Sequence, residues 1–357
     1  MKAIFSPGSS YHDPHVREYA GWVRILDLYR EGLEELGYKV FIPEVDPKLI
    51  DQSSTVSKIE SYDLVAATQL YESDVGLEDG DIFLGPPGYS LAQMMTLPFN
   101  VKKFLYVWNN ADWWRDQQLA EEYRRFNQPY DLSPTWRWIN TTALEMCDHV
   151  IACSPWVKWS HSKVVPEEKI SIAFWGVDNQ MFTRPEKEPT GFRVLFVGGD
   201  PIRKGLGYLL KALDGSEGIE LWVVGCRPLT IVGPNGSKPD VQQFGMVPHS
   251  QVPAIMRQCH VICIPTLEDG IACALQEGMA SGLVPIGTPE VAEVFEPGVS
   301  GFRVPYGDVE GIRNALVTLR DNPDLRRKMS IEARRLAESQ TWGRTKEEFK
   351  RIISAGV

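Results

Sequence analysis

The sequence predicts an α/β protein with two doubly wound domains, each built on a mostly parallel sheet. Its 357 residues exceed what one hydrophobic core usually serves, which favours two domains. In both halves, short apolar strands alternate with loops and amphipathic helices, a pattern typical of parallel sheets covered by helices. Residues 192–197 form a near-continuous apolar run, as expected of a strand buried on both faces.

The first half of the chain begins with a strand, a loop and a helix. Residues 2–6 are predicted as the strand, and apolar side chains at helical spacing from Val16 to Leu36 predict a helix that ends at Gly37. Further strands of this half are predicted at residues 38–42, 63–68, 81–84, 103–108 and 149–154. This alternation predicts a doubly wound first domain.

Charge and cysteine content exclude several classes of function. The formal net charge is −10, and residues 1–180 carry all of it, with 16 basic and 26 acidic side chains. No nucleic acid is therefore expected as the main partner, because phosphate backbones bind basic surfaces. The six cysteines match no zinc-ligand or CxxC pattern, which is typical of core residues in a reduced, intracellular protein. We find no signal peptide and no apolar run of membrane-spanning length, so we expect a cytoplasmic protein.

Residues 109–134 interrupt the alternation with a long polar and aromatic segment. Seven of the eleven tryptophans lie between Trp108 and Trp159. Aromatic rings stack on sugars and also cover hydrophobic grooves, so this region is a candidate acceptor site or a surface that contacts a membrane. The alternative is that these tryptophans are ordinary core and surface residues.

An acidic loop follows the predicted strand at residues 261–264, and a helix closed by Gly282 comes next. In open α/β sheets, ligands bind beyond the carboxyl ends of the strands. Asp269 and Glu277 are eight residues apart, so their carboxylates are expected within about 12 Å of each other. That span suits two hydroxyl groups at opposite ends of one ligand. The alternative is that both acids only cap or flank the start of the helix.

A second polar loop follows the strand at residues 192–197. Gly198 and Gly199 permit a tight turn, and Arg203 and Lys204 supply cations. The next helix offers amide groups and a positive dipole end, so the loop favours binding of a diphosphate. The alternative is that Arg203 and Lys204 are a solvated surface pair.

The segment Asp269-Gly270-Ile271-Ala272, followed by Glu277, resembles the acidic-x7-Glu motif of retaining GT-B glycosyltransferases of family 4, the glycosyl transferases of group 1. The resemblance implies that Glu277 holds the ribose hydroxyls of a nucleotide sugar. It also implies that Asp269 and the backbone at Gly270, Ile271 and Ala272 hold the sugar. Two residues depart from the motif, since Asp269 replaces a glutamate and Ala272 replaces a glycine.

The same resemblance implies the remaining donor-site residues. Lys204 matches the lysine of an Arg-Lys pair that binds the diphosphate. Gly199 stands where the arginine would be, so we assign the guanidinium role to Arg203. Gly225 and Val247 mark the two places where backbone groups are expected to cradle the base.

Four residues are candidates on the acceptor side. Gly8 and His12 lie in the first loop, where a merely solvated His12 is the alternative. Asn109 stands where family members commonly have a sugar-contacting histidine, and Asp112 follows it.

The resemblance also implies two Rossmann-like domains facing a cleft. Residues 1–178 would bind the acceptor, 179–191 would be a linker, 192–340 would bind the nucleotide sugar, and a helix at 341–357 would cross back to the first domain. The implied reaction moves a sugar from a UDP- or GDP-sugar to a hydroxyl of a glycan, lipid-linked or small aromatic acceptor. It would retain the anomeric configuration and need no metal or other cofactor. Alternatives are a non-catalytic nucleotide-sugar-binding subunit, or a phosphorylase or epimerase of this fold; peripheral contact with the cytoplasmic face of a membrane is also left open.

Overall fold

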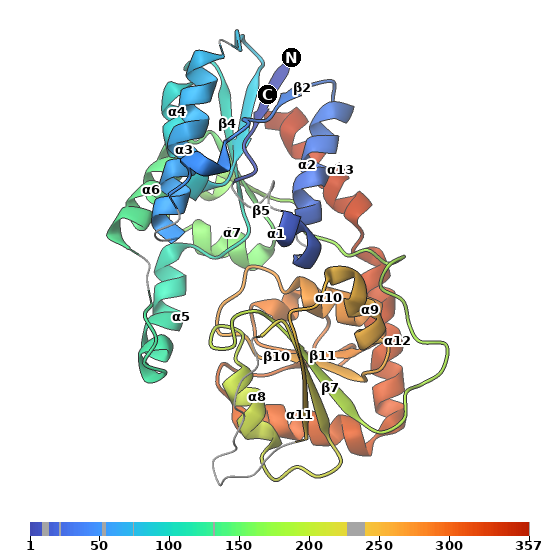
Figure 1. Ribbon diagram of the computed structural model, residues 1–357. Coiled ribbons are helices and arrows are strands. Elements are labelled where there is room, and N and C mark those ends of the chain that lie inside the picture. Colours follow the sequence, from blue (N-terminus) through green and yellow to red (C-terminus); the bar gives the residue numbers. More distant parts are fainter. Residues whose placement is uncertain are drawn as a thin grey trace. The chain divides into compact units, whose positions relative to one another are not determined.

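The computed structural model describes residues 1–8, 14–20, 23–51, 55–73, 75–130, 133–226 and 240–356 (Figure 1). The chain divides into two compact units. Unit 1 comprises Met1–Asp116, Asp131–Phe174 and Gly343–Val357, and unit 2 comprises Gln117–Tyr130 and Trp175–Trp342. The segment predicted as a linker, residues 179–191, lies within unit 2. None of the described helices has both the length and the apolar character needed to cross a membrane.

Unit 1 contains a six-stranded sheet in the order β2-β1-β3-β4-β5-β6, and all neighbouring strands are parallel. The register pairs Ile4 with Phe83 and Leu84 with Phe104, all of them fully buried. Such runs of buried apolar residues are the pattern from which strands of this sheet could be predicted. The strands are β1 (Lys2–Phe5), β2 (Lys39–Phe41), β3 (Ile82–Gly85), β4 (Lys102–Val107), β5 (His149–Ala152) and β6 (Ile170–Ile172).

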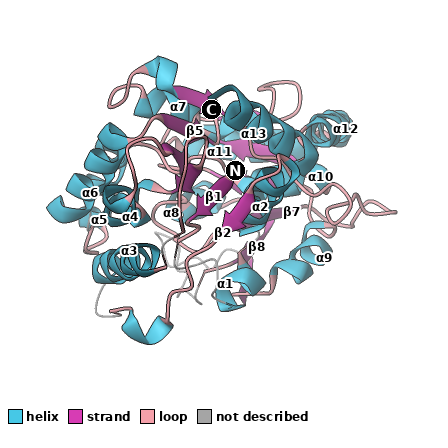
Figure 2. Cartoon of the chain, turned by 90° about the horizontal axis from the view of Figure 1, so that it is seen from above, coloured by secondary structure: helices cyan, strands magenta, loops and turns pink. Residues whose placement is uncertain are grey.

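Helices cover both faces of the unit 1 sheet (Figures 1 and 2). The last helix packs on α2, where Tyr29 and Phe349 stack with ring centroids 4.5 Å apart. Gly32 permits this contact, because a Cβ there would lie 2.9 Å from the Phe349 ring. The helices of unit 1 are α1 (Pro14–Tyr19), α2 (Arg24–Glu35), α3 (Thr55–Glu72), α4 (Leu91–Thr96), α6 (Pro134–Met146), α7 (Pro155–His161) and α13 (Trp342–Gly356).

The predicted strand at residues 63–68 is wrong, because these residues lie within α3. Tyr62, Ala66 and Leu70 are buried, whereas Leu64 is 63% exposed. Buried positions four residues apart show a helical period, which the local run of apolar and β-branched residues concealed.

The polar and aromatic segment at residues 109–134 contains a helix, α5 (Asp112–Arg125). Its apolar signal is weak, because most of its side chains are polar and few are buried. Ion pairs one turn apart support the helix instead, such as Arg125 with Glu121 at 3.3 Å. The helix ends before Asn127, which adopts a left-handed conformation with φ of 55°.

Unit 2 contains a second six-stranded parallel sheet, in the order β12-β11-β10-β7-β8-β9. Val194 and Phe196 of β7 belong to a core formed with α8 and α11. Ile262 of β10 faces α10, where Gly278 leaves room for it, since a Cβ there would lie 2.7 Å from Ile262. The strands are β7 (Arg193–Val197), β8 (Glu220–Val224), β9 (Val241–Gly245), β10 (Val261–Ile264), β11 (Val284–Gly287) and β12 (Phe302–Arg303); the helices are α8 (Leu206–Leu213), α9 (Val252–Met256), α10 (Cys273–Ala280), α11 (Val309–Asp321) and α12 (Pro323–Ser339).

Candidate functional site

The two loops singled out in the second half of the sequence follow neighbouring strands of unit 2. β7 and β10 pair directly, yet β8 follows β7 on one side and β11 follows β10 on the other. The direction in which successive strands are added to the sheet therefore reverses between β7 and β10. Residues 198–205 and 265–272 leave the carboxyl ends of these strands, at the position where open α/β sheets bind ligands.

Gly205 allows the two loops to touch. It adopts φ of +75°, and a Cβ on it would lie 2.0 Å from the carbonyl oxygen of Pro265. The amide of Leu267 and the hydroxyl of Thr266 both donate hydrogen bonds to the carbonyl of Arg203, at 2.8 and 3.0 Å. The predicted diphosphate loop and the predicted acidic loop are thus joined through their backbones.

Most amides of the diphosphate loop are engaged within the loop itself. The carboxylate of Asp200 accepts from the amides of Ile202 and Arg203, at 3.1 Å each, and from the hydroxyl of Tyr123. The amide of Lys204 donates to the carbonyl of Asp200 at 3.0 Å. The amides of Ile202, Arg203 and Lys204, which were expected to be free for an anion, are therefore occupied within the loop.

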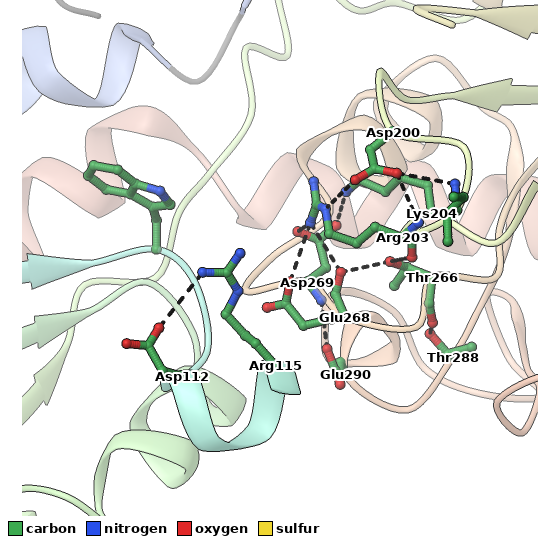
Figure 3. Close-up of polar contacts among 12 residues, drawn as sticks. Asp112, Arg115, Asp200, Arg203, Lys204, Thr266, Glu268, Asp269, Thr288 and Glu290 are labelled. Carbon is green, nitrogen blue, oxygen red and sulfur yellow. Dashed lines mark hydrogen bonds and ion pairs between the residues drawn. The ribbon is translucent and has the colours of Figure 1, made fainter. Parts of the chain in front are cut away.

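Arg203 and Lys204 both face the acidic loop (Figure 3). Lys204 Nζ contacts the carboxylate of Asp269. Arg203 Nη1 lies 3.6 Å from Oε2 of Glu268 and 3.6 Å from Oδ1 of Asp269. Burial lowers the pKa of Arg203, but the Asp269, Glu268 and Asp200 carboxylates together raise it above its ordinary value. The residues predicted for the diphosphate and for the sugar thus form one cluster of paired charges, in which Glu268 is fully buried.

Residues beyond β11 hold the acidic loop in place. The Asp269 amide donates to the carboxylate of Glu290 at 2.7 Å, and Tyr306 donates to the same carboxylate at 3.0 Å. The hydroxyl of Thr288 donates to the carbonyl of Thr266 at 2.7 Å (Figure 3). Sequence reasoning missed Glu290, because only the pairing of β10 with β11 brings it to this loop.

Glu277 lies in α10, and its carboxylate meets a histidine that was not predicted. His249 Nε2 lies 2.7 Å from Glu277 Oε1. Glu277 is buried, with 11% of its side chain accessible, and His249 Nε2 lies against only one of its two carboxylate oxygens. Burial lowers the pKa of His249, but the hydrogen bond and charge of Glu277 and the charge of Asp178 raise it overall. The only local signal for His249 was its place two residues after Val247.

The predicted backbone contacts for the base and the sugar lie around the same strand ends. Gly225 follows β8 with φ of +92°, and its amide donates to the carbonyl of Gly245 at 2.8 Å. Gly199 lies across from it, with the Gly225 carbonyl 3.8 Å from a Cβ built on Gly199. Val247 is half-buried after β9, and Gly270, Ile271 and Ala272 form the buried approach to α10.

The acceptor-side candidates belong to unit 1. Gly8 follows β1 with φ of +83°, and His12 lies outside the described residues. Asn109 and Asp112 follow β4 and line a cavity of about 260 Å³. Asn140 donates to Asp112 Oδ2 at 2.9 Å, while burial raises the pKa of Asp112 above its ordinary value.

Most tryptophans of this region pack on one another or line the cavity, and Trp113 does both. The ring centroids of Trp113 and Trp159 lie 5.7 Å apart and those of Trp114 and Trp156 lie 5.8 Å apart. The cavity is lined by Trp108, Trp136 and the same Trp113. The aromatic segment therefore contributes both to packing among its own rings and to the lining of a cavity.

Comparison with known families matches residues 191–322 to the family described as glycosyl transferases group 1. A phosphatidyl-myo-inositol mannosyltransferase of Mycobacterium leprae is 29% identical over 177 residues, which are 45% of this chain and 46% of the relative. The match therefore spans about half the length of that relative. Asp269, Glu277, His249 and the diphosphate loop all lie inside the segment that the family covers.

Solved structures resemble the chain over nearly its whole length. Sucrose-phosphate synthase from Thermosynechococcus elongatus gives a TM-score of 0.76 at 16% identity and covers 99% of both chains. HepE of Anabaena, solved with UDP and glucose, gives a TM-score of 0.68 at 13% identity and covers 99% of this chain and 100% of its own. At such identities the likeness shows the fold alone. It confirms the predicted α/β architecture with two Rossmann-like sheets, the GT-B fold.

Proposed function

We propose that this chain, which has the GT-B fold and whose residues 191–322 match the glycosyl transferases of group 1, moves a sugar from a nucleoside-diphosphate donor to a hydroxyl group. The observation that carries the proposal is the contact of Lys204 with Asp269, between the loops that follow β7 and β10. The pair combines a cation that suits a diphosphate with a carboxylate that suits sugar hydroxyls. Its position at the reversal point of the sheet is where such folds bind nucleotides.

In this proposal, unit 2 holds the donor. Lys204 binds the diphosphate, and the backbone near Gly225 and Val247 contacts the base. Glu277 accepts hydrogen bonds from the ribose through Oε2, the oxygen that His249 leaves available. Asp269 accepts from the sugar, and its carboxylate is already oriented by its contact with Lys204.

The proposed reaction breaks the bond between the anomeric carbon and the diphosphate oxygen and forms a bond to the acceptor oxygen. The Lys204 ammonium stabilises the charge that develops on the departing diphosphate, as a preorganised cation does for any leaving phosphate. Arg203 contributes indirectly, because its guanidinium already faces Glu268 and Asp269 and balances their charge. The acceptor proton passes to an oxygen of the departing phosphate, on the face where the new bond forms. This course retains the anomeric configuration and needs no metal.

Thermal unfolding with UDP, GDP and ADP, each with and without EDTA, tests the donor site. A ligand at a hundredfold excess over its Kd stabilises the folded state by about 2.7 kcal/mol, enough to raise Tm by a few degrees. We expect one nucleotide to raise Tm, with the shift unchanged by EDTA and lost in Glu277→Gln. Glu310→Gln serves as the matched control, because Glu310 lies at the exposed start of α11 with 73% of its side chain accessible.

Turnover then separates the transferase from its alternatives. The donor sugar named by the best nucleotide is incubated with the protein, and release of the nucleoside diphosphate and the anomeric configuration of the product are followed by NMR. Retained configuration supports the proposed course, whereas inverted configuration refutes it. Nucleotide binding without any release of diphosphate would instead indicate a non-catalytic binding subunit. The absence of any nucleotide-induced shift would contradict the donor site itself.

A further inference from the structure

Unit 1 holds a cavity of about 260 Å³ at the carboxyl ends of β3 and β4. Its walls come from residues 86–89 after β3, from residues 106–115 around the start of α5, and from α6. The carboxyl edge of a parallel sheet is the usual ligand side of such a fold. The cavity is therefore placed to take a substrate of its own, and its role as an acceptor site rests on the proposed transfer reaction.

One wall of the cavity is an aromatic ring held rigidly in position. Trp136 lies in the first turn of α6, where its amide donates to the N-cap hydroxyl of Ser133 at 3.1 Å. Its ring packs directly on the backbone of Gly88, because a Cβ there would lie 2.2 Å from Cη2 of the indole. Trp108 adds a second ring, whose centroid lies 5.4 Å from that of Tyr106. The aromatic surface is thus formed before any ligand arrives.

The cavity is also lined by polar side chains, which are held in place by hydrogen bonds and ion pairs. Asp112 Oδ2 accepts from Asn140 at 2.9 Å, and Asp112 Oδ1 lies 3.9 Å from Nη1 of Arg115. Arg137, which also lines the cavity, pairs with Asp116 at 2.6 Å. Both guanidinium groups therefore face a carboxylate. The lining carries Arg115, Arg137 and Asp112, and both guanidinium charges are offset by these carboxylate contacts.

We infer that this cavity binds a neutral saccharide or polyol ring, which is the acceptor of the transfer. The C–H face of such a ring fits against the flat indole of Trp136, while its hydroxyls reach Asp112 and the neighbouring amides. An alkyl chain would have no hydroxyl groups to offer to Asp112 and the neighbouring amides. A phosphorylated sugar would bring its charge beside Asp112. The polar lining thus selects among the acceptor classes considered from the sequence, and it favours the glycan.

Saturation-transfer NMR on the full chain tests this inference with defined probes. Methyl α-D-glucopyranoside, methyl α-D-mannopyranoside and myo-inositol represent neutral rings, whereas p-cresol, hexanol and glucose 6-phosphate represent the rejected classes. We expect saturation transfer to at least one neutral ring, reduced fivefold or more in Trp136→Leu and in the isosteric Asp112→Asn. Trp138→Leu is the matched control, because Trp138 lies on the same helix, is 61% exposed and does not line the cavity.

Several outcomes would overturn the inference. These are saturation transfer to p-cresol or hexanol but to no neutral ring, preference for glucose 6-phosphate, an equal loss in Trp138→Leu, or no transfer to any probe. Nucleotide-induced Tm shifts, measured on the same samples, distinguish the two proposals. Nucleotide binding without ring binding refutes only the saccharide acceptor. Ring binding without nucleotide binding refutes the transferase and leaves the cavity as a saccharide site.

Discussion

His249 Nε2 lies 2.7 Å from Glu277 Oε1, which joins the turn after β9 to helix α10. The ring of Phe182 packs beside the imidazole, with centroids 5.5 Å apart. The imidazole therefore fixes the rotamer of Glu277 and leaves its other oxygen for a ligand. In the proposed donor site, His249 is a positioning residue for the carboxylate that binds the ribose.

Nucleotide affinity is expected to fall as the pH rises, because protonated His249 loses its charge and with it the charge-assisted hydrogen bond to Glu277. The pKa of His249 is raised in the folded protein, so the stabilisation by its protonated form is complete below about pH 6.5 and is lost as the pH rises through the raised pKa. Calorimetric titration with the best nucleotide, from about pH 6 to 8.5, measures this. His249→Leu removes a charge-assisted hydrogen bond, which is worth about 1.5–3 kcal/mol, and should weaken binding about tenfold.

His249→Gln is the matched variant, because its amide nitrogen can occupy the place of Nε2 without titrating. We expect it to bind within about threefold of the unmodified protein at pH 8, with a flat pH profile. If His249→Leu and the unmodified protein bound equally well at every pH, the imidazole would have no part in positioning Glu277.

Lys204→Ala is expected to weaken binding of the nucleoside diphosphate at least tenfold, because a charge-assisted contact to phosphate contributes about 1.5–3 kcal/mol. Binding of the corresponding nucleoside, which lacks the phosphates, should change by less than about twofold. Calorimetry with both ligands gives the comparison. Lys211→Ala, an exposed lysine on α8, is the control. Equal losses for nucleoside and diphosphate would show that Lys204 acts on the fold and not on the phosphates.

Arg203→Gln is expected to affect stability more than ligand binding. Arg203 balances the fully buried Glu268 and the nearby Asp269, so removing it leaves uncompensated charge and destabilises the fold by about 3 kcal/mol. Urea unfolding at pH 7 measures this loss of stability. Arg335→Gln removes an exposed pair with Glu332 and should change stability by less than about 1 kcal/mol. Similar effects of the two substitutions would contradict the role of Arg203.

The sequence was sufficient for features that depend on local patterns. The strand expected at residues 103–108 is β4, because residues 104–107 form the continuous apolar run typical of a buried parallel strand. Gly282 has the left-handed conformation expected of the residue that closes α10, with φ of +84°. The fold class follows from the same alternation of strands and helices, and the solved GT-B structures confirm it.

Features that depend on contacts between distant segments could not be predicted from the sequence. His249 and Glu277 are 28 residues apart, and no spacing rule connects a turn to a helix across a sheet. The helical period of α3 was hidden because residues 63–68 taken alone resemble a strand, whereas the burial of Tyr62, Ala66 and Leu70 depends on what packs against them. The pairing of Arg203 with the acidic loop likewise required the adjacency of β7 and β10.

Gly205→Ala is expected to disrupt the donor site by separating its two loops. Gly205 has φ of +75°, a conformation that costs other residues about 1–3 kcal/mol. The added Cβ would also lie 2.0 Å from the carbonyl oxygen of Pro265, which is backbone and has little room to move. We therefore expect a destabilisation greater than about 3 kcal/mol, together with loss of the nucleotide-induced Tm shift.

Gly215→Ala isolates the conformational part of that effect. Gly215 lies just beyond the other end of α8 and has a similar φ of +71°. Apart from its chain neighbours, no atom of the residues that the structure describes lies within 4 Å of an added Cβ. The Gly215→Ala variant should therefore lose only about 1 kcal/mol of stability, through backbone strain, and keep its nucleotide-induced Tm shift. Thermal unfolding of both variants, with and without the best nucleotide, gives the comparison. Because backbone strain is common to both glycines, a larger loss at Gly205 measures the contact between the diphosphate loop and the end of β10. Equal losses would mean that the close approach of the two loops contributes nothing to the site.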